Sequence, residues 1–212
     1  DHETDPSLFY LSGRDLHIGR SSDSGASWER SSIPAPDGLM VMVTFRGCVL
    51  RDGTILLPVG GPVIGELDNP DAPRPWRQFM ARSTDNGDTW GIAPVCADPS
   101  GAYTEELALL ELEDGRLLAM TRAHRMRDPI TGYLWQQWSE DAGLTWSAPV
   151  ETQIWGYPAY LNLLRDGRVL CTYGHRRMPS GIRAALSDDG GRSWNLDEER
   201  ILRDDGGTPA QG

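Results

Sequence analysis

The sequence predicts an all-β fold, a β-propeller built from consecutive four-stranded antiparallel sheets. Two repeated motifs predict it. The pattern S-x-D-x-G-x-[ST]-W occurs four times without a mismatch, at residues 21–28, 83–90, 139–146 and 187–194. An Asp-Gly pair flanked by apolar residues lies between successive copies, at Asp52-Gly53, Asp114-Gly115 and Asp166-Gly167. Units of about 50 residues with four strands each are typical of propeller blades.

Each unit is expected to begin with a strand that ends at the Asp-Gly pair, because glycine adopts the positive φ of a tight hairpin turn. A second strand, a variable loop and a third strand follow, and the S-x-D turn leads into the fourth strand. In that turn the aspartate can accept hydrogen bonds from its own backbone, and the tryptophan can wedge between sheets. We therefore expect four aspartates to be structural and not catalytic: Asp23, Asp85, Asp141 and Asp189.

The composition excludes several classes of protein and partner. No apolar run approaches the ~20 residues of a membrane-spanning helix. A net charge of −11 makes neither a nucleic acid nor a membrane an expected partner. Cys48, Cys96 and Cys171 lie too far apart in the sequence for a disulfide framework or a metal site, and the histidines lack a metal-binding spacing, so we expect no metal and no cofactor. The chain begins at Asp1 and not at a methionine, so we expect residues to precede it and assign it neither to the cytoplasm nor to secretion.

Strand direction separates the turns from the variable loops. If the first strand of each unit runs down to the Asp-Gly turn, the Asp-Gly and S-x-D turns share one face, here called the lower face. The loops that join second and third strands, about residues 58–77, 122–132 and 173–181, then lie on the opposite, upper face. Variable loops on one face of a repeat fold are typical of a binding face.

The upper-face loops combine arginines with histidines in an otherwise acidic chain. All 20 basic residues are arginines, whose planar guanidinium groups bind carboxylates bidentately, so these loops predict a site for an anion. The charged and aromatic residues concerned are Asp68, Asp71, Arg74, Arg77, Arg122, His124, Arg125, Arg127, Tyr173, His175, Arg176 and Arg177.

S-x-D-x-G-x-[ST]-W is the Asp-box, and over nearly all of its length the chain resembles the sialidase (neuraminidase) superfamily of BNR-repeat propellers. The resemblance implies a six-bladed propeller, of which residues 1–212 would form one partial domain with about four blades. It also implies an exo-glycosidase that hydrolyses a terminal acidic sugar, sialic acid or a related one. The expected partner is therefore an acidic carbohydrate or glycoconjugate.

The resemblance also assigns residues to the site. Bacterial sialidases have a glutamate that opens an inner strand and an arginine that closes the next one, with the spacing of Glu106 and Arg122. By this resemblance Glu106 is the catalytic partner of the nucleophile, and Arg122 is one of three arginines that bind the substrate carboxylate. Another of the three is implied in the following blade, at Arg176 or Arg177. Both are offset from the position of the family's third arginine, so the resemblance does not choose between them.

Three more residues are expected beside the ligand. Tyr173 and His175 come just before the two adjacent arginines, and Arg46 begins an inner strand and so faces the central axis. The first arginine of the cluster and the aspartate that serves as acid are expected upstream of Asp1, and the catalytic tyrosine beyond Gly212.

A tyrosine nucleophile suits this substrate, because the carboxylate on its anomeric carbon would repel an anionic nucleophile. A nearby glutamate can take the tyrosine proton. Two other functions remain open from the sequence. One is a polysaccharide lyase acting on uronates, in which Tyr173, His124 or His175 moves the proton, and the other is a carbohydrate-binding propeller without catalysis.

Overall fold

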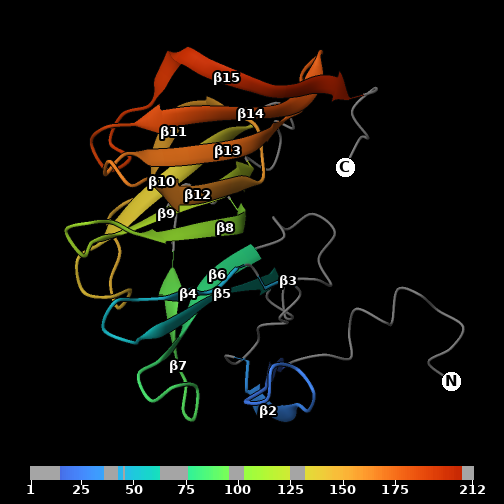
Figure 1. The fold of residues 1–212 in the computed structure, drawn as a ribbon, viewed down its shortest axis with the longest axis vertical. Coiled ribbons are helices and arrows are strands. Elements are labelled where there is room, and N and C mark those ends of the chain that lie inside the picture. Colours follow the sequence, from blue (N-terminus) through green and yellow to red (C-terminus); the bar gives the residue numbers. More distant parts are fainter. Residues whose placement is uncertain are drawn as a thin grey trace, which may run out of the picture.

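The computed structural model describes residues 15–35, 43–44, 46–62, 76–95, 103–124 and 132–206. Regular structure in these segments is entirely β, in four antiparallel sheets placed one after another (Figure 1). No helix that could cross a membrane occurs among these residues. The predicted all-β fold of consecutive sheets is confirmed. The sheets are β1 (Leu16–Arg20) and β2 (Glu29–Ile33); β3 (Val43–Thr44), β4 (Cys48–Val49), β5 (Ile55–Pro62), β6 (Trp76–Ser83) and β7 (Gly91–Val95); β8 (Tyr103–Glu111), β9 (Leu117–His124), β10 (Tyr133–Ser139) and β11 (Val150–Trp155); and β12 (Ala159–Leu163), β13 (Val169–His175), β14 (Ser180–Ser187) and β15 (Asn195–Gly206).

Within each sheet the strands pair in chain order, from an inner strand to an outer one. In the third sheet β8 pairs with β9, β9 with β10 and β10 with β11. In the second sheet β3 and β4 form one interrupted inner strand along β5, with Val43 opposite Gly60 and Cys48 opposite Leu56. The inner strands pack side by side, β8 against both β4 and β12. The start of each inner strand therefore lies near the start of its neighbour in the next sheet.

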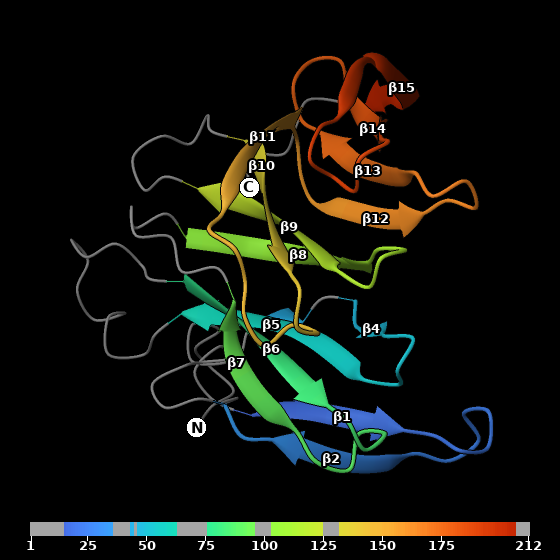
Figure 2. The ribbon, with the colours of Figure 1, turned by 90° about the vertical axis from the view of Figure 1, so that its left-hand side faces the viewer.

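The lower face has the predicted composition. Figure 2 shows the turns of β1–β2, β8–β9 and β12–β13 at the same end of the sheets. Arg51, beside the first Asp-Gly turn, donates hydrogen bonds to the carbonyls of Leu112 and Glu113 beside the second. Neighbouring Asp-Gly turns are thus tied together on this face, and β5, β9 and β13 run from these turns to the other.

The Asp-boxes are turns closed by their own side chains. In the third box, Asp141 accepts hydrogen bonds from the backbone N–H and the hydroxyl of Thr145, and Ser139 accepts one from the N–H of Gly143. The same bonds recur in the other three boxes. The hydroxyl bonds lower the pKa of Asp23, Asp85 and Asp141 to about 2. The prediction that these aspartates cap their own turns is confirmed.

The hydrophobic core lies between the sheets, and the box tryptophans extend it. Trp146 packs against the cluster formed between the second and third sheets, and Trp194 against the one between the third and fourth. Trp194 also donates a hydrogen bond of 3.0 Å to Gln136 on β10 of the preceding sheet. These two side chains act as the predicted wedges. Trp28 differs because no described sheet precedes its own, and it is 66% exposed.

Candidate functional site

The candidate site begins where β8 starts and β9 ends, on the upper face. Glu105 lies opposite Arg122 in the register of these two strands. The register shifts between Glu105 and Ala108, and Glu106 has a φ of +55°, a left-handed conformation that is unusual for a residue other than glycine. In a regular strand adjacent side chains point to opposite faces, but this bulge brings both glutamates to the same guanidinium. Arg122 Nη1 lies 3.5 Å from Oε2 of Glu105 and 3.5 Å from Oε2 of Glu106.

This cluster is half-buried and has more negative than positive charge. The Arg122 side chain is 14% exposed, and its guanidinium lies 3.8 Å from the centre of the Tyr157 ring. Burial raises the pKa of Glu105. The positive charge of Arg122 offsets only part of this increase, and the negative charge of Glu106 adds to it. Oε2 of Glu106 and Nε of Arg122 are buried and have no hydrogen-bond partner in the described part of the chain. The predicted pairing of Glu106 with Arg122 is thus present as an ion pair. Within the described residues, Oε2 of Glu106 is an acceptor and Nε of Arg122 a donor that make no hydrogen bond.

Tyr157 joins a second arginine to this cluster. Arg176 lies 4.7 Å from the centre of the Tyr157 ring, and its Nε donates a 3.4 Å hydrogen bond to the Tyr157 carbonyl. Among the described residues Arg176 has no carboxylate within ion-pair distance. An aromatic face attracts a cation without neutralising it, so Arg176 keeps its charge available to a ligand.

Arg177 is presented in the same way by a different ring. Its guanidinium lies 4.0 Å from the centre of Trp155, and the ring of His175 meets Trp155 edge-on, with 5.8 Å between centroids. Burial and the nearby Arg183 lower the pKa of His175, so the imidazole is neutral at pH 7. Its Nδ1 is buried and has no hydrogen-bond partner within the described segments. Among the described residues Arg177 also has no carboxylate within ion-pair distance.

The structure places two of the predicted site residues apart from these groups. Tyr173 is 2% exposed, packs in the core, and donates its hydroxyl to Glu199, which also pairs with Arg183 at 2.7 Å. This burial and this carboxylate raise the pKa of Tyr173. Arg46 lies lower along the axis, with its guanidinium 4.9 Å from the centre of the Tyr160 ring. The position of Tyr173 favours a structural role.

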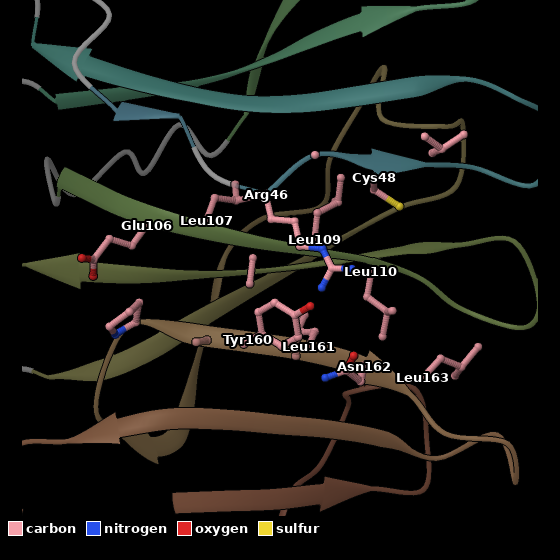
Figure 3. A pocket seen from close by; sticks show the side chains of 15 residues that line it. Arg46, Cys48, Glu106, Leu107, Leu109, Leu110, Tyr160, Leu161, Asn162 and Leu163 are labelled. Atoms are coloured by element: carbon pink, nitrogen blue, oxygen red, sulfur yellow. The ribbon is translucent and has the colours of Figure 1, made fainter. Parts of the chain in front are cut away.

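Arg46 and Glu106 are at different levels of one axial cavity. The cavity has a volume of about 440 Å³ and is lined by β4, β8 and β12 together with the residues just before them. Figure 3 shows Glu106 at one end of the row of inner-strand side chains, with Arg46 reaching toward Tyr160 farther along. The cavity wall between them is mostly apolar, with Leu107 and Leu109 from β8.

Some of the predicted residues lie outside the described residues: Asp68, Asp71, Arg74, Arg125 and Arg127, together with the side chains of Arg77 and His124. Among the described residues, no three His, Cys, Asp or Glu side chains are close enough to hold a metal ion.

Sequence reasoning missed Glu105, Trp155 and Tyr157. Trp155 ends the fourth strand of the third unit, and Tyr157 lies in the link to the next inner strand. Strand direction would have placed that link on the upper face. Glu105 could not be found in this way, because only the bulge turns it toward Arg122.

The fold and site define a propeller of the Asp-box class. A family model described as BNR repeat-like domain matches residues 7–206, and the chain belongs to this family. Among curated proteins, no sequence matches the chain.

Solved structures share the fold. A protein of unknown function from Dyadobacter fermentans is 26% identical, with a TM-score of 0.73 over 91% of this chain and 53% of that one. A Hadza microbial sialidase is 21% identical, with a TM-score of 0.62 over 90% of this chain and 37% of that one. An α-L-arabinanase from Penicillium chrysogenum, complexed with arabinobiose, is 20% identical, with a TM-score of 0.65 over 93% of this chain and 60% of that one. The chain spans about half the length of the first of these structures and shares the propeller fold of the sialidases.

Proposed function

We propose that the chain is the part of a sialidase-like exo-glycosidase that binds a terminal acidic sugar and activates the nucleophile. One observation carries the proposal: Glu106 and Arg122 meet at the upper end of the inner strand β8, and Arg176 contacts the same Tyr157 ring as Arg122. Guanidinium groups match the geometry of a ligand carboxylate. The sialidases and the arabinanase of like fold support a carbohydrate as the ligand.

In this proposal Glu106 is the general base. Its buried Oε2 has no hydrogen-bond partner among the described residues and would accept the hydroxyl proton of a tyrosine as the tyrosine oxygen attacks the anomeric carbon. An acidic side chain would protonate the leaving glycosidic oxygen. We expect both the tyrosine and the acid to come from blades that complete the six-bladed ring and that residues 1–212 do not include.

Arg122 has a double role in the proposal. It holds both glutamates through Nη1, and its Nε keeps a donor for the ligand. Arg176 and Arg177 supply cationic groups that no described carboxylate offsets. His175 and Arg46 stay candidate ligand contacts, one beside Trp155 and the other deeper in the axial cavity.

The test uses the full-length protein with a fluorogenic α-sialoside. Glu106→Gln should lower kcat by about 10²–10⁴, the usual range for a general base, and leave the melting temperature near that of the wild type. Arg122→Ala should weaken binding of an acidic-sugar inhibitor by about 1.5–3 kcal/mol, as expected for a charged hydrogen bond. Arg192→Ala, on an exposed lower-face turn, is the matched control. Unchanged turnover in the Glu106 variant would remove it from the mechanism, and equal effects of both arginine changes would reduce their role to general charge.

One observation favours the uronate lyase as a second candidate. A neutral His175 near Arg177, which no described carboxylate neutralises, could accept a proton next to a bound uronate carboxylate. Tyr173 suits this reaction less well, because it is buried and bonded to Glu199. A lyase would yield an unsaturated product, detected by its ultraviolet absorbance, and His175→Gln would abolish it. Binding of acidic sugars without either product would identify a carbohydrate-binding propeller.

A further inference from the structure

We propose that Thr121 and Gln78 are positioning residues that hold Glu106 in its unusual backbone conformation, and so fix where its carboxylate lies. The inference rests on the proposed function for its catalytic consequence, but its structural part stands on the contacts alone. Both side chains are buried, so their role is to hold Glu106 and not to contact a ligand.

The two side chains form a buried chain of hydrogen bonds that ends at the bulge. Gln78 Nε2 on β6 donates to Thr121 Oγ1 on β9, at 3.3 Å. Thr121 Oγ1 in turn donates to the carbonyl of Glu105, at 2.7 Å. Because the hydroxyl has only one proton, it donates to the nearer carbonyl of Glu105 and not to the carbonyl of Arg122, which lies at 3.3 Å. Both side chains are fully buried, and the Oε1 of Gln78 has no hydrogen-bond partner among the described residues.

The position of this bond explains what it controls. The carbonyl of Glu105 belongs to the peptide unit that precedes Glu106, so holding that carbonyl fixes the plane from which the φ of Glu106 is measured. At +55° this φ is unfavourable for glutamate and persists only if its surroundings impose it. The hydrogen bond from Thr121 supplies such a constraint, because Gln78 of the neighbouring sheet holds the Thr121 hydroxyl in place. Without this bond, a return to the regular register of the β8–β9 hairpin would move the Glu106 carboxylate by pairing this residue directly with Arg122, and would turn Glu105 to the opposite face.

Thr121→Val and Thr121→Ser separate the bond from the packing. Valine has nearly the same shape but cannot donate, whereas serine keeps the hydroxyl. In crystal structures we expect Thr121→Ser to keep the positive φ of Glu106 and the contact of Glu105 with Arg122, and Thr121→Val to lose both. A Thr121→Val structure in which Glu106 is unmoved would overturn the proposal. Gln78→Met removes only the hydrogen bond from Gln78 to Thr121. It serves as the test if Thr121→Val does not fold, and we expect it to loosen the contact of Glu105 with Arg122.

Kinetics on a fluorogenic α-sialoside with the full-length protein give the second readout. Thr121→Val should lower kcat at least tenfold with KM within twofold of the wild type, and Thr121→Ser should restore most of the rate. Thr152→Val is the matched control, because Thr152 is a buried threonine that accepts a hydrogen bond on β11, and it should leave kcat unchanged. A Thr121→Val loss that serine does not rescue, or an equal loss in the control, would show a merely structural role. If Glu106 moves as expected but the wild type does not cleave the sialoside, the positioning stands and the proposed function fails.

Discussion

Arg122→Met tests whether charge holds the upper-face cluster together. Methionine keeps much of the side-chain length and the apolar contact with Tyr157, but it removes the guanidinium from Glu105 and Glu106. At pH 7 two half-buried carboxylates would then face each other without the cation that now lies between them. We expect the protein to lose stability for this reason.

The structure sets the size of the loss. Each carboxylate oxygen lies 3.5 Å from Nη1 of Arg122, and a pair near this distance is worth about 4 kcal/mol at an effective dielectric constant of about 20. Breaking a fully buried pair costs about 3–5 kcal/mol. Solvent screens part of this cost, because Glu105 and Glu106 expose 22% and 24% of their side chains. We expect about 2–3 kcal/mol, which in a protein of this size lowers Tm by roughly 4–12 °C.

The assay is thermal unfolding between pH 4 and pH 8, with Arg192→Met as the control. Burial already raises the pKa of Glu105, and the variant removes the positive charge of Arg122 that partly offsets that effect. A carboxyl whose pKa is higher in the folded than in the unfolded protein favours folding in its protonated form. The deficit should therefore be largest at pH 7–8 and shrink as the pH falls toward about 4. A deficit of equal size at pH 4 and pH 8 would refute the ionic argument and leave lost packing on Tyr157 as the cause.

Three further changes test neighbouring parts of the argument. Glu105→Gln removes a carboxyl whose raised pKa opposes folding when it is ionised, so Tm should rise at pH 7.5 and match the wild type at pH 4. Asp141→Ala removes the cap of the third Asp-box and should cost about 1 kcal/mol in urea unfolding at pH 7. Because the hydroxyl of Thr145 lowers the pKa of Asp141 to about 2, that deficit should shrink as the pH falls from about 4 toward 2. Arg177→Lys keeps the charge but loses the planar stack on Trp155, and calorimetry should show acidic-sugar binding weakened roughly tenfold, whereas wild-type affinity would mean that charge alone matters.

The fold could be predicted in detail because its signals are local. An Asp-Gly turn needs only a glycine with positive φ, and an Asp-box needs only the side chains of its own eight residues, as the bonds of Asp141 to Thr145 illustrate. Sheet order then follows from chain order, since each strand pairs with the next.

The site was predicted only in part, because two of its features are not local. The meeting of Glu106 with Arg122 follows from hairpin geometry once the turn is known. The approach of Glu105 to the same guanidinium does not, because alternation along a strand predicts the opposite face. The burial of Tyr173 was also hidden, since its polar partner Glu199 comes from β15, two strands away in the sheet.

The three upper-face arginines differ in what holds them, and this difference bears on how the site would treat an anion. Rings hold Arg176 and Arg177, which therefore keep their full charge, whereas two carboxylates hold Arg122 and together outweigh it by one negative charge. A ligand carboxylate is thus drawn first to the ring-held pair and is repelled from the surroundings of Arg122. A single proton on Glu105 removes that repulsion, because the cluster then becomes neutral. Burial raises the pKa of Glu105 and so favours this proton, and a neutral cluster would let Arg122 accept a ligand carboxylate.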